Sequence, residues 1–232
     1  VDGSGAAAPG EAAASVTAPT AAASGTRCLR AARAIVVAGT DTGVGKTWFA
    51  ADLVRALREA GHEVRYFKPV QTGDDSDTRT VIERSGLDPA HAPPPAVELP
   101  LPASVDQAAA DAGVEVSVQQ VFDATLAHLV AQPDAVWVIE CAGGLLVPFN
   151  ERETQADLLE RLDLPVVLVA RSGLGTLNHT MLTVEAMRTR RLPLLGVRLV
   201  GPRHQANQDS LASQGIRIFP DATGIVGRAL AV

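Results

Sequence analysis

The sequence is poor in aromatic residues and in cysteine. Aromatic side chains make up 3% of the 232 residues, and only two cysteines are present, Cys28 and Cys141. One lies in a low-complexity segment and the other in an apolar stretch, so the pair fits neither a disulfide framework nor a zinc site. This cysteine usage favours a reducing, cytoplasmic location.

Long apolar runs and an excess of basic residues are also missing. No run reaches the length of a membrane span, and the first 26 residues lack the basic start and apolar centre of a secretory signal. The formal net charge is -6, and the acids are spread along the chain. We therefore expect neither nucleic acid nor a membrane as a partner, and small molecules become the expected ligands.

The composition divides the chain into two parts. Residues 1–32 are mostly Ala, Gly, Ser, Thr and Pro, which cannot bury enough apolar surface to offset the entropy of ordering, so a flexible leader is expected. Residues 33–232 are long enough to bury one core, and the chain as a whole is 47% hydrophobic. We expect them to form a single domain.

From residue 34 onward, short β-branched runs alternate with helical patterns. The predicted strands are residues 35–38, 63–68, 135–139, 165–170 and 194–200, and the predicted helices are residues 46–60, 77–85, 118–131, 155–162 and 178–190. The proline-rich residues 89–104 are expected to be a surface connection. This alternation predicts an α/β fold: a doubly wound, mostly parallel sheet with helices on both faces, in which ligands bind at the carboxyl ends of the strands.

A glycine-rich loop connects the first predicted strand to the first predicted helix. Its sequence is Gly39-Thr40-Asp41-Thr42-Gly43-Val44-Gly45-Lys46-Thr47. Backbone N–H groups of such a loop close around phosphate oxygens, Lys46 supplies a positive charge, and the Thr47 hydroxyl is a magnesium ligand. The alternative is a glycine-rich turn with a chance Lys-Thr pair. The flanking strand and helix favour nucleotide binding and a P-loop NTPase-like three-layer sandwich.

Three charged residues follow other predicted strands or loops. Glu140 stands at the end of a buried strand, where a carboxylate can face a nucleotide-bound magnesium, although a surface ion pair is the alternative. Asp77 is a second candidate ligand, and an ordinary loop acid is the competing interpretation. Lys68 ends a strand just before a proline, where its ammonium can hold charge on a transferred group, unless it is a solvated lysine.

Taken in order, four segments resemble the signatures of the dethiobiotin synthase family. They are the phosphate loop, Lys68-Pro69-Val70-Gln71-Thr72-Gly73, Glu140-Cys141-Ala142-Gly143-Gly144 and Leu174-Gly175-Thr176-Leu177-Asn178-His179-Thr180. The resemblance covers residues 34–201. Five residues, rather than the common four, separate Gly39 from Gly45, and the family's loop has the same extra residue. It implies an ATP-dependent cyclo-ligase of biotin biosynthesis. That enzyme carboxylates 7,8-diaminononanoate with CO2, phosphorylates the carbamate with ATP and closes the ureido ring, giving dethiobiotin, ADP and phosphate.

The resemblance also implies roles for individual residues. The implied catalytic residues are Lys46, Lys68 and Thr42; the implied magnesium ligands are Thr47, Asp77 and Glu140; the implied substrate contacts are Thr72, Gly143, Gly144, Leu145 and Asn178. The implied nucleotide contacts are Gly43, Val44, Gly45, Lys46, Thr47, Trp48, Asp77 and Glu140, with Val200, Gly201, Phe219, Pro220 and Asp221 near the base. Magnesium is the implied cofactor and ATP the cosubstrate.

By the same resemblance, residues 173–178 lie at the interface of a homodimer, where a helix start of the neighbouring subunit receives the substrate carboxylate. Two positions depart from the family, which usually has glycine where Cys141 stands and often an asparagine where Val200 stands. Two rivals share the phosphate loop. An amidating synthetase normally adds a glutaminase domain for which this chain is too short. A partitioning ATPase has an early lysine in the loop, where this chain has Thr40-Asp41-Thr42.

Overall fold

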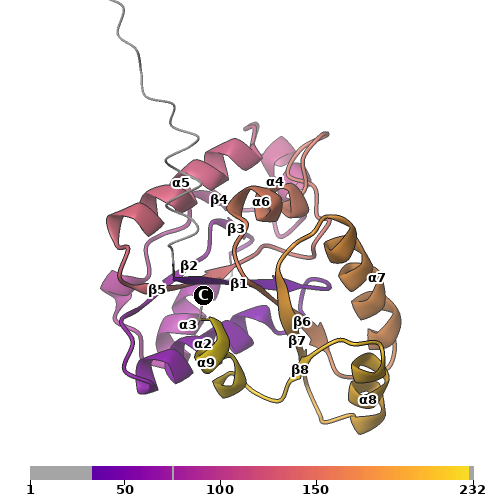
Figure 1. The fold of residues 1–232 in the computed structure, drawn as a ribbon. Helices are drawn as coiled ribbons and strands as arrows, with labels where there is room; N and C mark the ends of the chain where they lie inside the picture. The colour runs from indigo at the N-terminus through magenta and orange to yellow at the C-terminus, as the bar shows by residue number, and fades with distance from the viewer. Residues whose placement is uncertain (1–32, 75, 230–232) are drawn as a thin grey trace, which may run out of the picture.

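The computed structural model describes residues 33–74 and 76–229. The predicted leader, residues 1–32, lies outside the described residues. The chain forms a six-stranded parallel sheet with the order β2-β5-β1-β6-β7-β8 (Figure 1). The strands are β1 (Ala34–Gly39), β2 (Val64–Phe67), β5 (Val136–Glu140), β6 (Val166–Arg171), β7 (Leu194–Val200) and β8 (Ile218–Phe219). Every predicted strand is therefore present.

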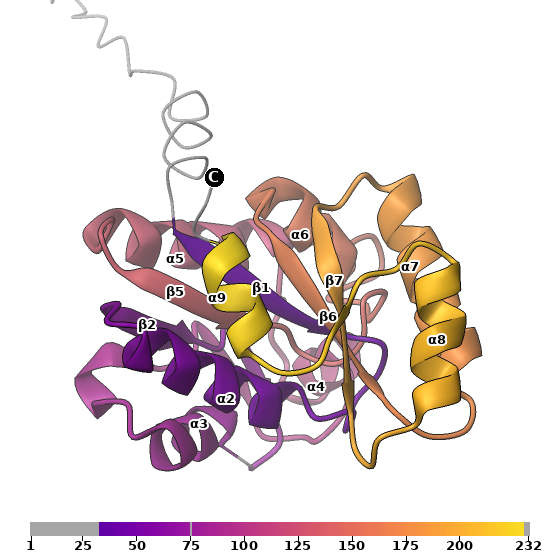
Figure 2. The ribbon, with the colours of Figure 1, turned by 60° about the horizontal axis from the view of Figure 1, so that its bottom comes forward.

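Helices cover both faces of this sheet (Figures 1 and 2). On one face lie α4 (Val105–Asp111), α5 (Val118–Ala131), α6 (Gln155–Leu162), α7 (Thr176–Thr189) and α8 (Gln205–Ser213). On the other lie α2 (Lys46–Glu59), α3 (Asp77–Ser85) and α9 (Thr223–Ala229). Successive residues of a strand point to opposite faces, so Val36 packs in the first core and Val37 in the second. The predicted doubly wound, three-layer fold is confirmed.

Side-chain caps set several helix starts at the predicted residues. The Ser76 and Ser117 hydroxyls each accept a backbone N–H three residues on, both at 3.1 Å, which starts α3 and α5. A reciprocal capping box between Thr154 and Asp157 starts α6. Helix α7 begins at Thr176, two residues earlier than predicted, so Asn178 lies in its first turn.

The proline-rich segment is more ordered than the sequence predicts. A 3-10 helix, η1 (Pro89–His91), is followed by β4 (Val97–Leu99), which pairs in parallel with β3 (Val70–Thr72). The prediction of a surface connection holds for Pro89 and Ala90, which are exposed, but it is wrong for β4, where Val97 and Leu99 are buried. Neither β3 nor α4 was predicted. The small second sheet lies beside the carboxyl end of β2 and carries one side of the site.

Among the described residues, no helix combines the length and the apolar character needed to cross a lipid bilayer.

Candidate active site

The phosphate loop joins β1 to α2 as predicted. Gly43 and Gly45 adopt left-handed backbone conformations, with φ values of 69° and 98°. A side chain at Gly45 would also clash with Val200, because a Cβ built there lies 2.7 Å from Cγ1 of that valine. Glycine is thus required at this position by both its backbone conformation and its neighbour. Lys46 starts α2, and its Nζ donates a 2.9 Å hydrogen bond to the carbonyl oxygen of Asp41.

The three predicted magnesium ligands meet beside this loop. The Thr47 hydroxyl oxygen lies 2.7 Å from Oδ1 of Asp77 and 2.8 Å from Oε1 of Glu140. A hydroxyl has one proton and donates to one carboxylate at a time, so three oxygens converge with a single hydrogen among them. Hard oxygen atoms in this arrangement suit magnesium, and the residues therefore fit the implied ion.

Lys68 joins the same two carboxylates. Its Nζ lies 2.6 Å from Oδ2 of Asp77 and 3.1 Å from Oε1 of Glu140. Burial lowers the pKa of Lys68, but the two carboxylates outweigh it and the pKa ends above its ordinary value. Burial raises the pKa of Asp77, whereas the Lys68 charge and the Thr47 hydrogen bond hold it below its usual range. Lys68 is therefore a buried ammonium ion.

A second ammonium ion lies close to the first. Burial and the charge of Lys68 both lower the pKa of Lys46, against the opposing pull of Glu140. Like charges packed together in a buried site favour an anionic ligand that separates them. Lys46 and Lys68 are also the only two lysines in the 232-residue sequence, and sequence reasoning did not use that signal.

A cavity of about 1050 Å³ opens over these groups. The predicted residues that line it are Thr42, Gly43, Val44, Gly45, Lys46, Thr47, Trp48, Lys68, Thr72, Asp77, Glu140, Gly143 and Val200. The predicted residues that do not line it are Gly144, Leu145, Asn178, Gly201, Phe219, Pro220 and Asp221. The residues predicted to contact the phosphates and the metal therefore line one cavity. Most residues predicted to contact the base, and some predicted to contact the substrate, do not line it.

The substrate-side residues have different surroundings. Gly143 has a φ of 61°, and a Cβ built there lies 2.7 Å from Cγ2 of Val147 and 3.6 Å from Oγ1 of Thr42. Leu145 is buried in the core, so only its backbone can face a ligand. Asn178 is exposed on the first turn of α7 and does not reach the cavity of its own chain.

The predicted base-side residues lie where β7 and β8 end. Phe219 is buried, and its ring lies next to Gly196 of β7 and Gly224 of α9. Arg198 donates to the carbonyl oxygens of Phe219 and Pro220. Asp221 accepts from the backbone N–H of Thr223 at 2.9 Å and so caps α9. These backbone groups are already engaged within the chain.

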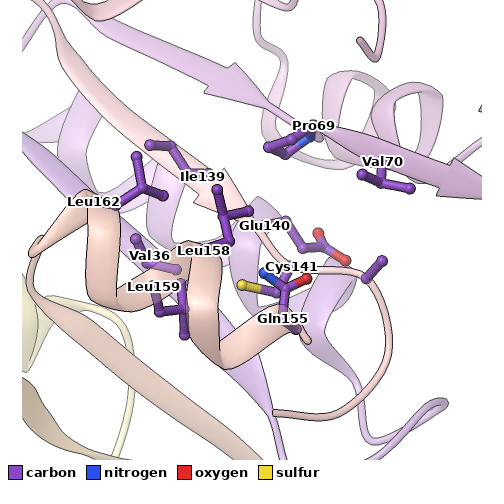
Figure 3. A pocket seen from close by; sticks show the side chains of 11 residues that line it. Val36, Pro69, Val70, Ile139, Glu140, Cys141, Gln155, Leu158, Leu159 and Leu162 are labelled. Atoms are coloured by element: carbon purple, nitrogen blue, oxygen red, sulfur yellow. The ribbon is translucent and has the colours of Figure 1, made fainter. Parts of the chain in front are cut away.

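Cys141 points away from the carboxylate of Glu140, a predicted magnesium ligand. Figure 3 shows its sulfur directed toward Leu159 while the carboxylate of Glu140 points the other way. The thiol contacts a small pocket of about 10 Å³ that is otherwise mostly apolar. Burial raises the pKa of this thiol to about 12, so it stays protonated and inert. The larger side chain at this position therefore does not crowd the carboxylate of Glu140.

Sequence reasoning missed two polar partners of the site. The Tyr66 hydroxyl donates a 2.9 Å hydrogen bond to Oε2 of Glu140. Arg171, at the end of β6, lines the cavity and lies 3.4 Å from Oδ2 of Asp41 in the phosphate loop. Arg171 had a usable signal, since a charged residue at the carboxyl end of a parallel strand lies near the ligand. For Tyr66 the only signal in the sequence was its spacing of two residues from Lys68, which predicts that both side chains lie on one side of a strand.

Several known proteins are similar to this chain. The sequence family described as an AAA domain matches residues 33–219. The chain is 43% identical to the ATP-dependent dethiobiotin synthetase BioD of Nitrobacter hamburgensis over 183 residues, which are 78% of this chain and 81% of that protein. It is 48% identical to the protein of the same name from Anaeromyxobacter dehalogenans over 170 residues, covering 71% of this chain and 75% of that one. Among solved structures it is similar to a ParA family ATPase from Chlorobium tepidum TLS, at 16% identity and a TM-score of 0.48, covering 86% of this chain and 88% of that one.

Proposed function

The chain belongs to the ATP-dependent dethiobiotin synthetases, and from that premise we propose how its residues divide the reaction among them. It is an ATP-dependent ligase of biotin biosynthesis. The observation that carries the assignment of roles is the meeting of Thr47, Lys68, Asp77 and Glu140 beside the phosphate loop. We place the reacting groups there, in the cytoplasmic setting where ATP is supplied.

The proposed substrates are 7,8-diaminononanoate, CO2 and ATP. One amine of the diamine adds to CO2 and loses a proton, giving a carbamate. A carbamate oxygen then attacks the γ-phosphorus of ATP and releases ADP. The second amine attacks the resulting carbonyl carbon and expels phosphate, which closes the cyclic urea. The carbamate, the γ-phosphate and the phosphorylated carbamate are all anionic. The site must therefore stabilise negative charge.

Lys46 and Lys68 would supply that charge compensation. Both ammonium groups are buried, and charge–charge attraction is stronger in a low-dielectric site than in water. Lys46 follows the loop glycines and would contact the β- and γ-phosphates. Lys68 lies on the other side, next to Asp77 and Glu140, and would hold the carbamate and the transferred phosphoryl group.

Thr47, Asp77 and Glu140 would hold the magnesium ion. When bound, magnesium would neutralise phosphate oxygens during transfer. In the part of the chain that the structure describes, no cluster of three or more His, Cys, Asp or Glu residues has metal-binding spacing. The proposed site therefore combines two carboxylates with a hydroxyl, and phosphate oxygens of the nucleotide would complete it.

Other cavity residues would position the two ligands. Thr42 and Thr72 would contact the carbamate or the diamine, with backbone N–H groups of residues 143–145. The loop backbone and Trp48 would contact the phosphates and ribose, while Val200 would lie near the base. Gly201 and residues 219–221 stay predictions for base contact, supported by their place beyond the ends of β7 and β8.

We propose a homodimer in which α7 of one subunit completes the site of the other. Leu174 is fully exposed and Leu182 is 58% exposed, so the start of α7 presents apolar side chains beside Asn178. The helix start would receive the substrate carboxylate. Mixing the inactive variants Lys68→Ala and Asn178→Ala tests this arrangement: mixed dimers should regain activity in one of their two sites. A monomer by sedimentation, or no regained activity, would contradict it.

The decisive assay for the function follows phosphate release and product mass together. The purified chain is given ATP, magnesium and bicarbonate, with and without 7,8-diaminononanoate. We expect phosphate release that depends on the diamine and one cyclic urea per phosphate. Nucleotide binding without diamine-dependent product would refute the proposed reaction.

A further inference from the structure

Tyr66 lies in β2, next to the strand that carries Glu140. The two strands are parallel, and Tyr66 is paired with Val138, two residues before Glu140. The Tyr66 hydroxyl donates its 2.9 Å hydrogen bond to Oε2 of Glu140. The side chains of both residues are 0% exposed. Water therefore does not compete for this hydrogen bond.

The two oxygens of Glu140 have separate partners. Oε1 faces the site, where it accepts from Thr47 at 2.8 Å and from Lys68 at 3.1 Å. Among the described residues, only Tyr66 is hydrogen-bonded to Oε2. A phenol is protonated at neutral pH, and the Tyr66 hydroxyl is the donor of this hydrogen bond.

We propose that Tyr66 is a positioning residue for Glu140, whose Oε1 its hydroxyl keeps turned toward Thr47 and the phosphate loop. The proposal rests on the proposed function, because Glu140 acts there as a magnesium ligand. The last torsion of a glutamate is broad, so the carboxylate has no strong preference of its own. A buried hydrogen bond on the far oxygen selects one orientation before the metal arrives.

Removing the hydroxyl should therefore weaken metal binding. A buried charged acceptor without its donor turns toward any other partner, and here those partners lie at Thr47 and Lys68. Both oxygens of the Glu140 carboxylate would then compete for Thr47 and Lys68, which now donate to Oε1. Mutation of a residue that hydrogen-bonds a metal ligand typically lowers metal affinity by about 10–100-fold.

The test is Tyr66→Phe in the full chain, with Mn2+ as the probe. Free Mn2+ is followed by electron paramagnetic resonance while it is titrated into protein saturated with ADP, so no turnover is needed. We expect the Mn2+ affinity to fall about tenfold and the magnesium concentration for half-maximal turnover to rise in parallel, with the KM for the diamine within about twofold of wild type.

Thr125→Val is the matched control. Thr125 is also a buried hydroxyl, 1% exposed, and donates a 2.8 Å hydrogen bond to the Val121 carbonyl within α5. We expect it to lower the melting temperature without changing Mn2+ affinity. An unchanged Mn2+ affinity in Tyr66→Phe would overturn the proposal, and so would an equal fall in the control. Wild-type protein that binds Mn2+ with ADP but forms no cyclic urea would refute the proposed reaction instead.

A second measurement needs no variant. Tyr66 is the only tyrosine of the chain, so 13C-labelling of tyrosine at Cζ gives one NMR resonance. We expect this resonance to shift when Mg2+ and ADP are added, because the charge of Glu140 is then shared with the ion. A resonance that does not move would overturn the proposal even if Tyr66→Phe failed to fold.

Discussion

The phosphate half of the site and its predicted base half are built differently. In the phosphate half, at the ends of β1 and β5, buried Lys68 and Glu140 form direct ion pairs and hydrogen bonds with neighbouring side chains. In the base half, at the ends of β7 and β8, Val200 is apolar, and Arg198 engages the carbonyls of Phe219 and Pro220. Chemistry requires charges at fixed positions, whereas holding a base requires mainly shape. We therefore expect substitutions in the first half to affect turnover and those in the second to affect nucleotide affinity.

The largest effect should come from Lys68→Ala. The variant should lose about a thousandfold in kcat, because the ammonium that compensates the transferred group is gone, while it still binds ATP. Arg198→Ala is the matched cation from the base half, and it should raise the KM for ATP while leaving kcat nearly unchanged. Single-turnover kinetics and nucleotide titration check both. Near-normal turnover in Lys68→Ala would contradict the expectation that the phosphate half controls turnover.

Glu140→Gln should have the next largest effect. It keeps the side-chain volume but removes the charge that faces Thr47 and Lys68. We expect kcat at saturating ATP to fall about a hundredfold, together with Mn2+ affinity. Glu98→Gln in β4 is the control, because Glu98 is an exposed acid that does not line the cavity. Equal losses in the two variants would mean that net charge, rather than the site, is responsible.

Alkaline pH should lower the stability of the fold through the buried thiol of Cys141. Burial raises the pKa of this thiol from 9.0 to about 12. The unfolded chain loses the proton above pH 9.0 while the folded chain keeps it. The free energy of unfolding should therefore fall by about 1.4 kcal/mol, a factor of ten, per pH unit across that window. Urea unfolding of wild type and Cys141→Ala between pH 8 and 11 tests this, and equal slopes would refute it.

The smallest effect should come from Val200→Asn, which places an amide in the base half. We expect the ratio of KM values for ATP and GTP to change about threefold to tenfold, as one hydrogen bond does, with kcat unchanged. Val200→Thr is the nearly isosteric control for packing against Gly45. A change in kcat of the same size would show that the two halves are not separate.

The predicted elements that the structure confirms depend on local patterns. The helix from Lys46 follows from loop glycines and apolar spacing, and α3 extends from Asp77 to Ser85 as predicted. Capping residues placed the starts of α5 and α6. Helix α4 and strands β3 and β4 escaped prediction because they are short. Strand β4 in addition is flanked by prolines, and its partner strand is distant in the sequence.

The sequence by itself determined the fold class, the phosphate loop and the family, because these rest on residues close together in the chain. Only the tertiary structure decided which oxygen of Glu140 faces Thr47 and Lys68 and which one accepts the hydrogen bond from Tyr66. It also brought Asp77 to Thr47, 30 residues away, and Lys68 to Glu140, 72 residues away. The order and register of the strands bring these residues together. Neither is encoded in local spacing, because each depends on how distant strands pack into one sheet.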